Sequence, residues 1–155
     1  MKLKFMREAV RLAIANVKQG RGGPFGAVVV REGLVVGRGV NRVTSANDPT
    51  AHAEIVAIRE ACGNLGVFHL ADCELYTTCE PCPMCLGAAY WARVRRIYHA
   101  SSRADAAAAG FADEWIYEEF SRPPAARRVP LRRLGRAEGR KVFATWNRQP
   151  GRIEY

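Results

Sequence analysis

TTCEPCPMCLGA, Thr77 to Ala88, joins a predicted strand to a predicted helix and carries two cysteines at the junction. The strand covers Cys73 to Thr78 and the helix Pro83 to Trp91. Cys82 and Cys85 stand at the helix start, where a spacing of three residues puts both sulfurs on one face. Two thiolates there could bind one zinc ion, because a helix N-terminus favours the ionised form of a thiol. A CxxC pair also serves thioredoxin-like redox sites and structural zinc sites, so a third ligand has to decide.

The candidate third ligand is His52, in the stretch AHAEIVAIREA from Ala51 to Ala61. This stretch predicts an amphipathic helix with His52 in its first turn. Because the loops at the carboxyl ends of adjacent strands converge on one crevice, we expect His52 to lie near the cysteine pair. Three protein ligands leave the fourth position of zinc to water, as in catalytic sites, whereas a structural site is closed. Cys79 is the rival that could close the site as a fourth ligand.

Glu54 gives the predicted site a group that can move protons. Two residues along a helix rotate by about 200°, so Glu54 and His52 do not share one face of a regular helix. In the first turn, however, a carboxylate near the metal but outside its ligand shell can take a proton from the metal's water and return it to a leaving group. The alternative is a solvent-facing glutamate in the favourable first turn of a helix. The neighbouring ligand candidates favour the catalytic interpretation.

The remaining pattern predicts an α/β layered domain. Apolar residues at three-and-four spacing predict a helix over residues 3 to 18, and PFGAVVV and LVVGRGV predict a hairpin that turns at Arg31-Glu32-Gly33. A later strand is expected from Val94 to His99. The order of helices and strands indicates a mixed sheet with helices packed on it. Beyond it we expect helices at DAAAAG and DEWIYEEF, a fifth strand at VPLRRL, and a last helix from Glu138 to Asn147.

Length and cysteine content narrow the class further. A chain of 155 residues is expected to form one domain, residues 1 to 155, with a real hydrophobic core. The N-terminal residues do not resemble a signal peptide, and no apolar run approaches the roughly 18 residues of a membrane span. We therefore expect a cytoplasmic protein. In that compartment the five cysteines are thiols or metal ligands rather than disulfides.

The positive charge is concentrated at the C-terminal end. The net charge of the chain is +9, and residues 121 to 155 carry 10 Lys and Arg against 2 Asp and Glu, a net of +8. An arginine-rich surface on a tail or a partner-facing strand explains this excess, and a nucleic-acid footprint is the alternative. The segment RRVPLRRLGR has no interleaved aromatic residues, which a stacking platform for single strands would require.

HAE followed by PCPMC resembles the cytidine-deaminase-like superfamily of zinc deaminases. Four wider stretches resemble the guanine deaminases of bacteria, and this likeness thins between about residues 123 and 141. The resemblance implies a three-layer α-β-α sandwich with a mixed five-stranded sheet and helices on both faces. It also implies hydrolytic deamination of guanine to xanthine and ammonia, with one Zn²⁺ per subunit. The stretches are GGPFGAVVV, NRVTSANDPTAHAEIVAIREAC, YTTCEPCPMCLGAAYWARVRRIYHA and AAAAGFADEWIYEEF.

The resemblance also implies a role for each matching residue. His52, Cys82 and Cys85 would bind zinc, and Glu54 would be the proton shuttle. Among the substrate contacts, an asparagine would hydrogen-bond the purine edge, two aromatic residues would box the ring or else serve as plain core residues, and an acidic residue of the FADE segment would meet the polar edge. The implied substrate-binding residues are Asn41, Phe25, Ala53, Trp91, Asp113, its neighbour Glu114, and Tyr155.

Similar enzymes form dimers, and this implies a homodimer, with residues 121 to 155 crossing to cover the partner's active site. That segment ends in Phe143, Trp146 and Tyr155. Three rival functions remain: a tRNA adenosine deaminase, a guanosine or small-triazine deaminase, and a non-catalytic zinc module that binds RNA through RRVPLRRLGR. The acidic FADEWIYEEF segment argues against a nucleic-acid substrate, because a free base needs a closed lid and a strand needs an open groove.

Overall fold

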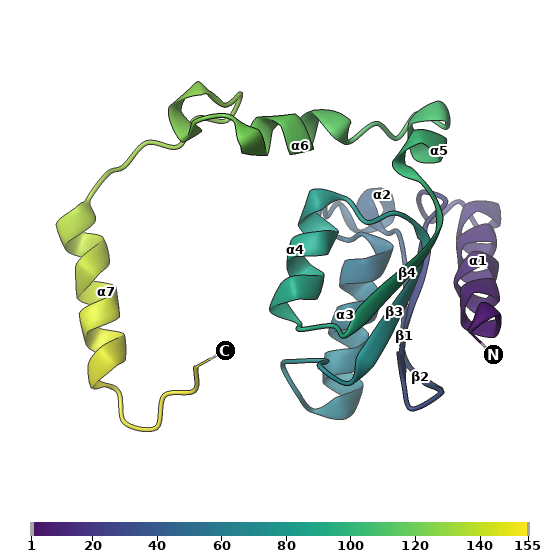
Figure 1. Ribbon diagram of the computed structural model, residues 1–155, viewed down its shortest axis with the longest axis horizontal. Coiled ribbons are helices and arrows are strands. Elements are labelled where there is room, and N and C mark those ends of the chain that lie inside the picture. The colour runs from purple at the N-terminus through teal and green to yellow at the C-terminus, as the bar shows by residue number, and fades with distance from the viewer. Residues whose placement is uncertain (1, 155) are drawn as a thin grey trace. The chain divides into compact units, whose positions relative to one another are not determined.

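The computed structural model describes residues 2 to 154, which fall into two compact units divided after Glu114. The first unit is an α/β domain built on a four-stranded sheet in the order β2-β1-β3-β4 (Figure 1). Its elements are α1 (Leu3–Lys18), β1 (Gly26–Arg31), β2 (Leu34–Val40), α2 (Val43–Ala46), α3 (Ala53–Leu65), β3 (Cys73–Cys79), α4 (Pro83–Trp91), β4 (Arg96–Ser101) and α5 (Arg103–Ala108).

The directions of the strands bring the carboxyl ends of three strands to the same end of the sheet. β1 pairs antiparallel with β2 and with β3, and β3 pairs parallel with β4. It follows that β2, β3 and β4 run the same way, so that their carboxyl ends lie together, as expected for a ligand-binding edge. The predicted hairpin is confirmed. Its turn residues Glu32 and Gly33 have φ of 50° and 82°, the left-handed backbone that two-residue hairpins favour.

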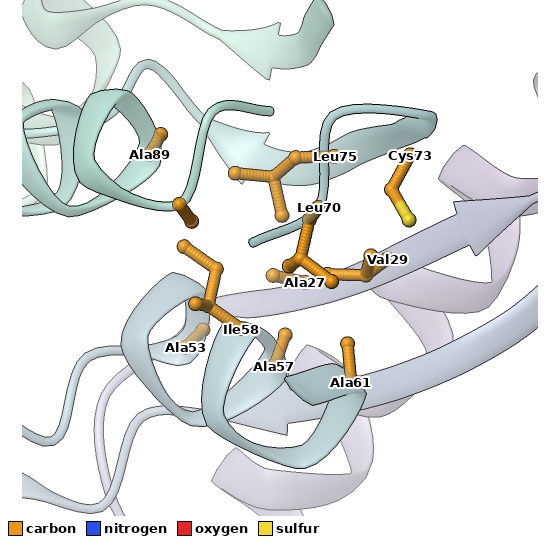
Figure 2. Packing of buried hydrophobic residues seen from close by; sticks show 11 residues of the cluster. Ala27, Val29, Ala53, Ala57, Ile58, Ala61, Leu70, Cys73, Leu75 and Ala89 are labelled. Atoms are coloured by element: carbon orange, nitrogen blue, oxygen red, sulfur yellow. The ribbon is translucent and has the colours of Figure 1, made fainter. Parts of the chain in front are cut away.

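Helices cover both faces of the sheet, which confirms the predicted three-layer architecture. Alternate residues of β3 point to opposite faces: Tyr76 packs with Phe5 of α1 on one side, and Leu75 faces α3 and α4 on the other. Figure 2 shows the second cluster, where small alanines of α3 and Ala89 of α4 meet the sheet. The site described below is built on this second layer.

Close packing between α3 and β2 fixes where α3 lies. Ala53, Ala57 and Ala61 form a row of small residues along α3, and β2 faces that row with glycines. A Cβ atom added at Gly39 would collide with the carbonyl oxygen of Ala53. Only glycine therefore allows the start of α3 to approach the strand this closely.

The start of α3 differs from the sequence-based expectation, whereas α4 begins at Pro83 as predicted. α3 begins at Ala53, so His52 lies before the helix with extended backbone (φ −70°, ψ 156°). Cys82 occupies the same place before α4, with φ −65° and ψ 167°. His52 is therefore not a first-turn residue, and the 200° separation expected between His52 and Glu54 in a regular helix does not apply.

The predicted fifth strand is wrong. Residues 129 to 134 form no strand, and the sheet described within residues 2 to 154 has four. Pro130 has no N–H to donate to a neighbouring strand, and Val129 and Leu134 are exposed by 78% and 97%, so no apolar face is covered there. β4 also begins at Arg96 and ends at Ser101 rather than covering residues 94 to 99, and the short helix α2 was not expected.

The second unit begins at Trp115, the second residue of α6 (Glu114–Ser121), and also contains a short 3₁₀ turn (Pro124–Ala126) and α7 (Arg136–Arg148). These helices confirm the two expected near DEWIYEEF and residues 138 to 147. Glu119 is buried, accepts a hydrogen bond from the backbone N–H of Arg128, and pairs with the guanidinium of Arg122 at 3.0 Å. None of the helices within residues 2 to 154 is long and apolar enough to cross a membrane.

Candidate metal centre and active site

A cavity of about 390 Å³ lies at the edge where the three strands end. Asn41 follows β2, Cys82 follows β3, and residues 103 to 113 follow β4. Each of these segments contributes lining residues, as do His52 and Glu54 at the start of α3. Its volume falls within the range of roughly 300 to 1,000 Å³ that small-molecule sites occupy. The expected convergence of strand ends on one crevice is therefore confirmed.

Three side chains at this cavity form a metal donor set. The ligand atoms of His52, Cys82 and Cys85 all lie within 4.8 Å of one another. The Nδ1 atom of His52 is 3.5 Å from each of the two sulfurs. In a tetrahedral zinc site, with Zn–S of about 2.3 Å and Zn–N of about 2.0 Å, a sulfur and a nitrogen are about 3.5 Å apart. The spacing and the ligand types thus fit zinc.

Cys79, the rival fourth ligand, does not belong to this donor set. Its thiol is buried and donates a hydrogen bond to the carbonyl oxygen of Ser102, at 3.5 Å. Within residues 2 to 154 the donor set has three members. Three ligands with a cavity beside them are the arrangement of a catalytic metal site rather than a structural one.

Hydrogen bonds among the three ligands prepare one thiolate. The hydrogen bond from Cys85 is the main cause that lowers the pKa of Cys82 to about 4, and it raises the pKa of Cys85. The hydrogen bond to Cys82 likewise raises the pKa of His52. The lowered pKa of Cys82 favours its thiolate, which is the form that binds zinc.

Glu54 lies beside the donor set with both carboxylate oxygens engaged. Its side chain is buried, and burial is the main cause that raises its pKa. Oε1 accepts a hydrogen bond from the hydroxyl of Thr77 at 2.9 Å, and Oε2 is 3.5 Å from the sulfur of Cys85. A buried carboxylate next to a metal site and lining the cavity is placed to exchange protons with a bound substrate.

Asn41 is held so that its amide nitrogen is the available donor. Its Oδ1 accepts hydrogen bonds from the backbone N–H groups of Gly23 and Val43, both at 3.3 Å. The side chain of Asn16 in turn donates to the carbonyl oxygens of Asn41, at 2.9 Å, and Gly23, at 3.1 Å. With its oxygen occupied, the Asn41 side chain can offer only N–H groups to a ligand.

The rest of the cavity is apolar with two charged features. Phe25 and Phe111 meet edge to face, with ring centroids 5.0 Å apart. Asp113 lines the cavity, and burial is the main cause that raises its pKa. The carboxylate of Glu80 pairs with the guanidinium of Arg103 at 3.0 Å. The walls could hold a flat ring, with polar groups at its edges.

The structure brings together most of the predicted site residues. His52, Glu54, Cys82, Asn41, Phe25 and Asp113 line the cavity, and Cys85 completes the donor set behind it. Ala53, Trp91 and Glu114 do not line it, and Trp91 is 70% exposed. Tyr155 lies outside the described residues. The lining residues that sequence reasoning missed are Gly23, Val43, Thr44, Cys79, Glu80, Arg103, Ala106, Gly110, Phe111 and Ala112. Of these, Cys79 and Glu80 stand inside the cysteine motif, and the last four lie in the stretch AAAAGFADEWIYEEF.

An α/β sheet edge that carries one histidine, two cysteines and a buried glutamate beside a cavity defines the class of zinc-dependent deaminases. The comparison with family models agrees with this class. Residues 1 to 101 match the model described as the cytidine and deoxycytidylate deaminase zinc-binding region. The chain belongs to this family.

Several known proteins are similar to the chain. Guanine deaminase of Bacillus subtilis is 49% identical over 97% of both chains, and the solved structure of guanine deaminase from that organism superposes with a TM-score of 0.95 over 98% of this chain and 97% of that one. A solved complex with 2,6-diaminopurine is 38% identical, with a TM-score of 0.68 over 70% of this chain and 61% of that one. A tRNA-specific adenosine deaminase of Agrobacterium fabrum is 51% identical, but only over 49% of this chain and 50% of its own length.

Proposed function

We propose that this protein is a zinc-dependent guanine deaminase that hydrolyses guanine to xanthine and ammonia in the cytoplasm. The observation that carries the proposal is the full-length similarity to the guanine deaminase of Bacillus subtilis, 49% identical over 97% of both chains. That similarity extends through residues 103 to 113, which supply one wall of the cavity. The tRNA-specific adenosine deaminase matches over only about half of the chain.

His52, Cys82 and Cys85 hold the zinc ion in this proposal, one ion per subunit. A zinc ion held there supplies a Lewis acid that makes water nucleophilic near neutral pH. The support is the fit already described, namely 3.5 Å from the histidine nitrogen to each sulfur, with two soft sulfur ligands and one imidazole.

Glu54 is the proton carrier of the reaction. It takes a proton from the attacking water as the water oxygen bonds to the ring carbon that bears the amine. It then passes that proton to the adjacent ring nitrogen. As the added hydroxyl becomes a carbonyl, Glu54 takes the hydroxyl proton and gives it to the amine, which leaves as ammonia as the carbon–nitrogen bond breaks. Its position beside the donor set and in the cavity wall supports this role, because a general acid–base group must reach both the water and the leaving nitrogen.

Asn41 and Asp113 recognise the hydrogen-bond acceptors and donors of the purine, respectively. The Asn41 amide donates to a ring acceptor, because its oxygen is occupied by two backbone N–H groups. The Asp113 carboxylate accepts from a ring N–H, while Phe25 packs against the ring with Phe111 behind it. Guanine offers both donors and acceptors around its ring, which matches this pair of contacts.

A substrate panel tests the proposed function. Purified protein is offered guanine, guanosine, adenine, cytosine and a tRNA anticodon stem, and ammonia release is measured for each. We expect guanine to be preferred over adenine and cytosine by up to roughly 10⁴-fold in kcat/KM, because a wrong ring leaves buried polar groups of the site unpaired. Deamination of the tRNA stem without deamination of guanine would overturn the proposal.

The same panel, run on Asp113→Asn, tests the recognition of the ring. Loss of a hydrogen bond to a charged group is expected to lower kcat/KM for guanine roughly 10- to 100-fold. Asp72→Asn is the matched control, because Asp72 makes an exposed ion pair with Arg31 and does not line the cavity.

In the proposed functional unit, two copies form a homodimer and residues 121 to 155 of one subunit cover the cavity of the other. Exposed apolar side chains in both units support this arrangement, since large exposed apolar residues often mark protein interfaces. Trp91 and Tyr90 on α4 are exposed by 70% and 77%, and Phe143 on α7 by 70%. In this proposal Tyr155, at the end of the exchanged segment, acts at the partner's cavity.

Mixed dimers test this proposal. Glu54→Gln inactivates the site of its own subunit but leaves its C-terminal segment intact. Tyr155→Ala leaves the site of its own subunit intact but impairs the segment that covers the partner's site. Co-expressed subunits are expected to regain activity, because one site of each mixed dimer would combine an intact Glu54 with an intact Tyr155. If the mixture is no more active than its two components, or if the protein is a monomer by light scattering, then the segment is not exchanged.

A further inference from the structure

Thr77 places a hydroxyl group in the apolar layer between the sheet and the helices α3 and α4. It lies on β3, the strand between β1 and β4, and its side chain is fully buried at 1% exposure. Cys73 and Leu75 precede it on the same face of the strand, which packs against α3 and α4. Valine has the same shape and would continue this row without a polar atom. Packing therefore does not explain why this position carries a hydroxyl group.

The hydroxyl of Thr77 is directed at Glu54. It donates a hydrogen bond to Oε1 of that carboxylate at 2.9 Å. Oε2, the other oxygen, is on the side of the metal donor set, 3.5 Å from the sulfur of Cys85. The carboxylate is thus held at one oxygen from the sheet side, while its second oxygen is turned toward the ligands.

We infer that Thr77 is a positioning residue that assigns different tasks to the two oxygens of Glu54. Oε1 stays in place, because it accepts the hydrogen bond from the Thr77 hydroxyl throughout the reaction cycle. Oε2 is the oxygen that carries the transferred proton. The hydrogen bond is compatible with Glu54 both before and after proton uptake at Oε2, and it keeps the carboxylate from rotating as the proton comes and goes. This inference rests on the proposed role of Glu54 and adds the residue that orients it.

Three variants test the inference. Thr77→Val removes the hydroxyl and keeps the shape, and kcat is expected to fall about 10- to 100-fold, the usual loss when a supporting partner of a metal-site residue is removed. KM and zinc content are expected to stay at the wild-type values, because Thr77 neither lines the cavity nor belongs to the metal donor set. Thr77→Ser keeps the hydroxyl and is expected to retain most of kcat. Leu75→Val is the matched control, since it perturbs the same buried row and is expected to lower the melting temperature with kcat retained.

Several outcomes would overturn the inference. One is a wild-type kcat in Thr77→Val. Another is a loss of kcat in Thr77→Ser as large as that in Thr77→Val. A third is a loss of zinc from Thr77→Val together with its activity. The ratio of kcat between variant and wild type is taken on whichever aminated ring the wild-type protein deaminates. If guanine is not a substrate but another ring is, the proposed function is wrong and the inference about Thr77 can still be tested. If the protein deaminates none of the rings, both the proposed function and the inference are overturned.

Discussion

Glu54→Gln is expected to reduce kcat for guanine by roughly 10²- to 10⁴-fold, the contribution of a positioned general acid–base group. Glutamine has nearly the same shape, and its amide oxygen can still accept the hydrogen bond from Thr77, so the buried position remains filled. A neutral amide cannot, however, take a proton from water at neutral pH. Steady-state rates of ammonia release measure the loss, and metal analysis is expected to show zinc retained at one ion per chain.

Glu60→Gln is the matched control for this change. Glu60 lies on the same helix, is exposed, and accepts a hydrogen bond from the backbone N–H of Arg38 away from the cavity. The same chemical change there is expected to leave kcat unaltered. A Glu54→Gln protein that retains the wild-type kcat would rule out the shuttle role, and one that loses its zinc would make Glu54 part of the metal site.

Cys82→Ala is expected to abolish zinc binding and, with it, activity. Two ligands remain after the change, and the thiolate with the lowered pKa is the one removed. Because a ligand that binds only the folded protein stabilises it, a chelator is expected to lower the melting temperature of the wild type and to leave that of Cys82→Ala unchanged. Zinc content by atomic absorption and thermal melts with and without chelator provide the measurements.

Cys79→Ala separates an open site from a closed one. The thiol of Cys79 is bonded to the carbonyl oxygen of Ser102 and stands outside the donor set, so zinc content is expected to stay at one ion per chain. If this variant loses zinc as completely as Cys82→Ala does, then the site is a closed structural site and the catalytic proposal falls.

The chemistry of the site could be predicted from the sequence because it is local. Cys82 and Cys85 are three residues apart at a helix start, and His52 and Glu54 are two residues apart at another, so short spacings place each pair. The sequence did not reveal that His52 precedes its helix. His52 has the extended backbone that is usual for the residue just before a helix, and sequence pattern alone does not locate a helix start to within a residue or two.

The parts that failed depend on tertiary context. VPLRRL has the apolar content of a short strand, yet its apolar side chains Val129, Leu131 and Leu134 are all exposed. Similarly, the periodicity of α1 predicts the helix but not its coverage, since Val10, Ile14 and Val17 remain partly exposed and line a second, apolar groove. In the wall at residues 103 to 113 only Asp113 was predicted, from the FADE segment, because small residues such as Ala106 and Gly110 carry no chemical signal in a sequence.

The match to the family model ends at residue 101. The metal ligands, Glu54, Thr77 and Asn41 all lie before that point, and the wall formed by residues 103 to 113 lies after it. The proposed catalytic residues and the proposed ring contacts Asn41 and Phe25 therefore lie within the part that the family model matches, whereas Asp113 lies beyond it. We therefore expect substitutions in residues 103 to 113 to alter which ring is accepted while the metal donor set, built before residue 101, keeps its zinc.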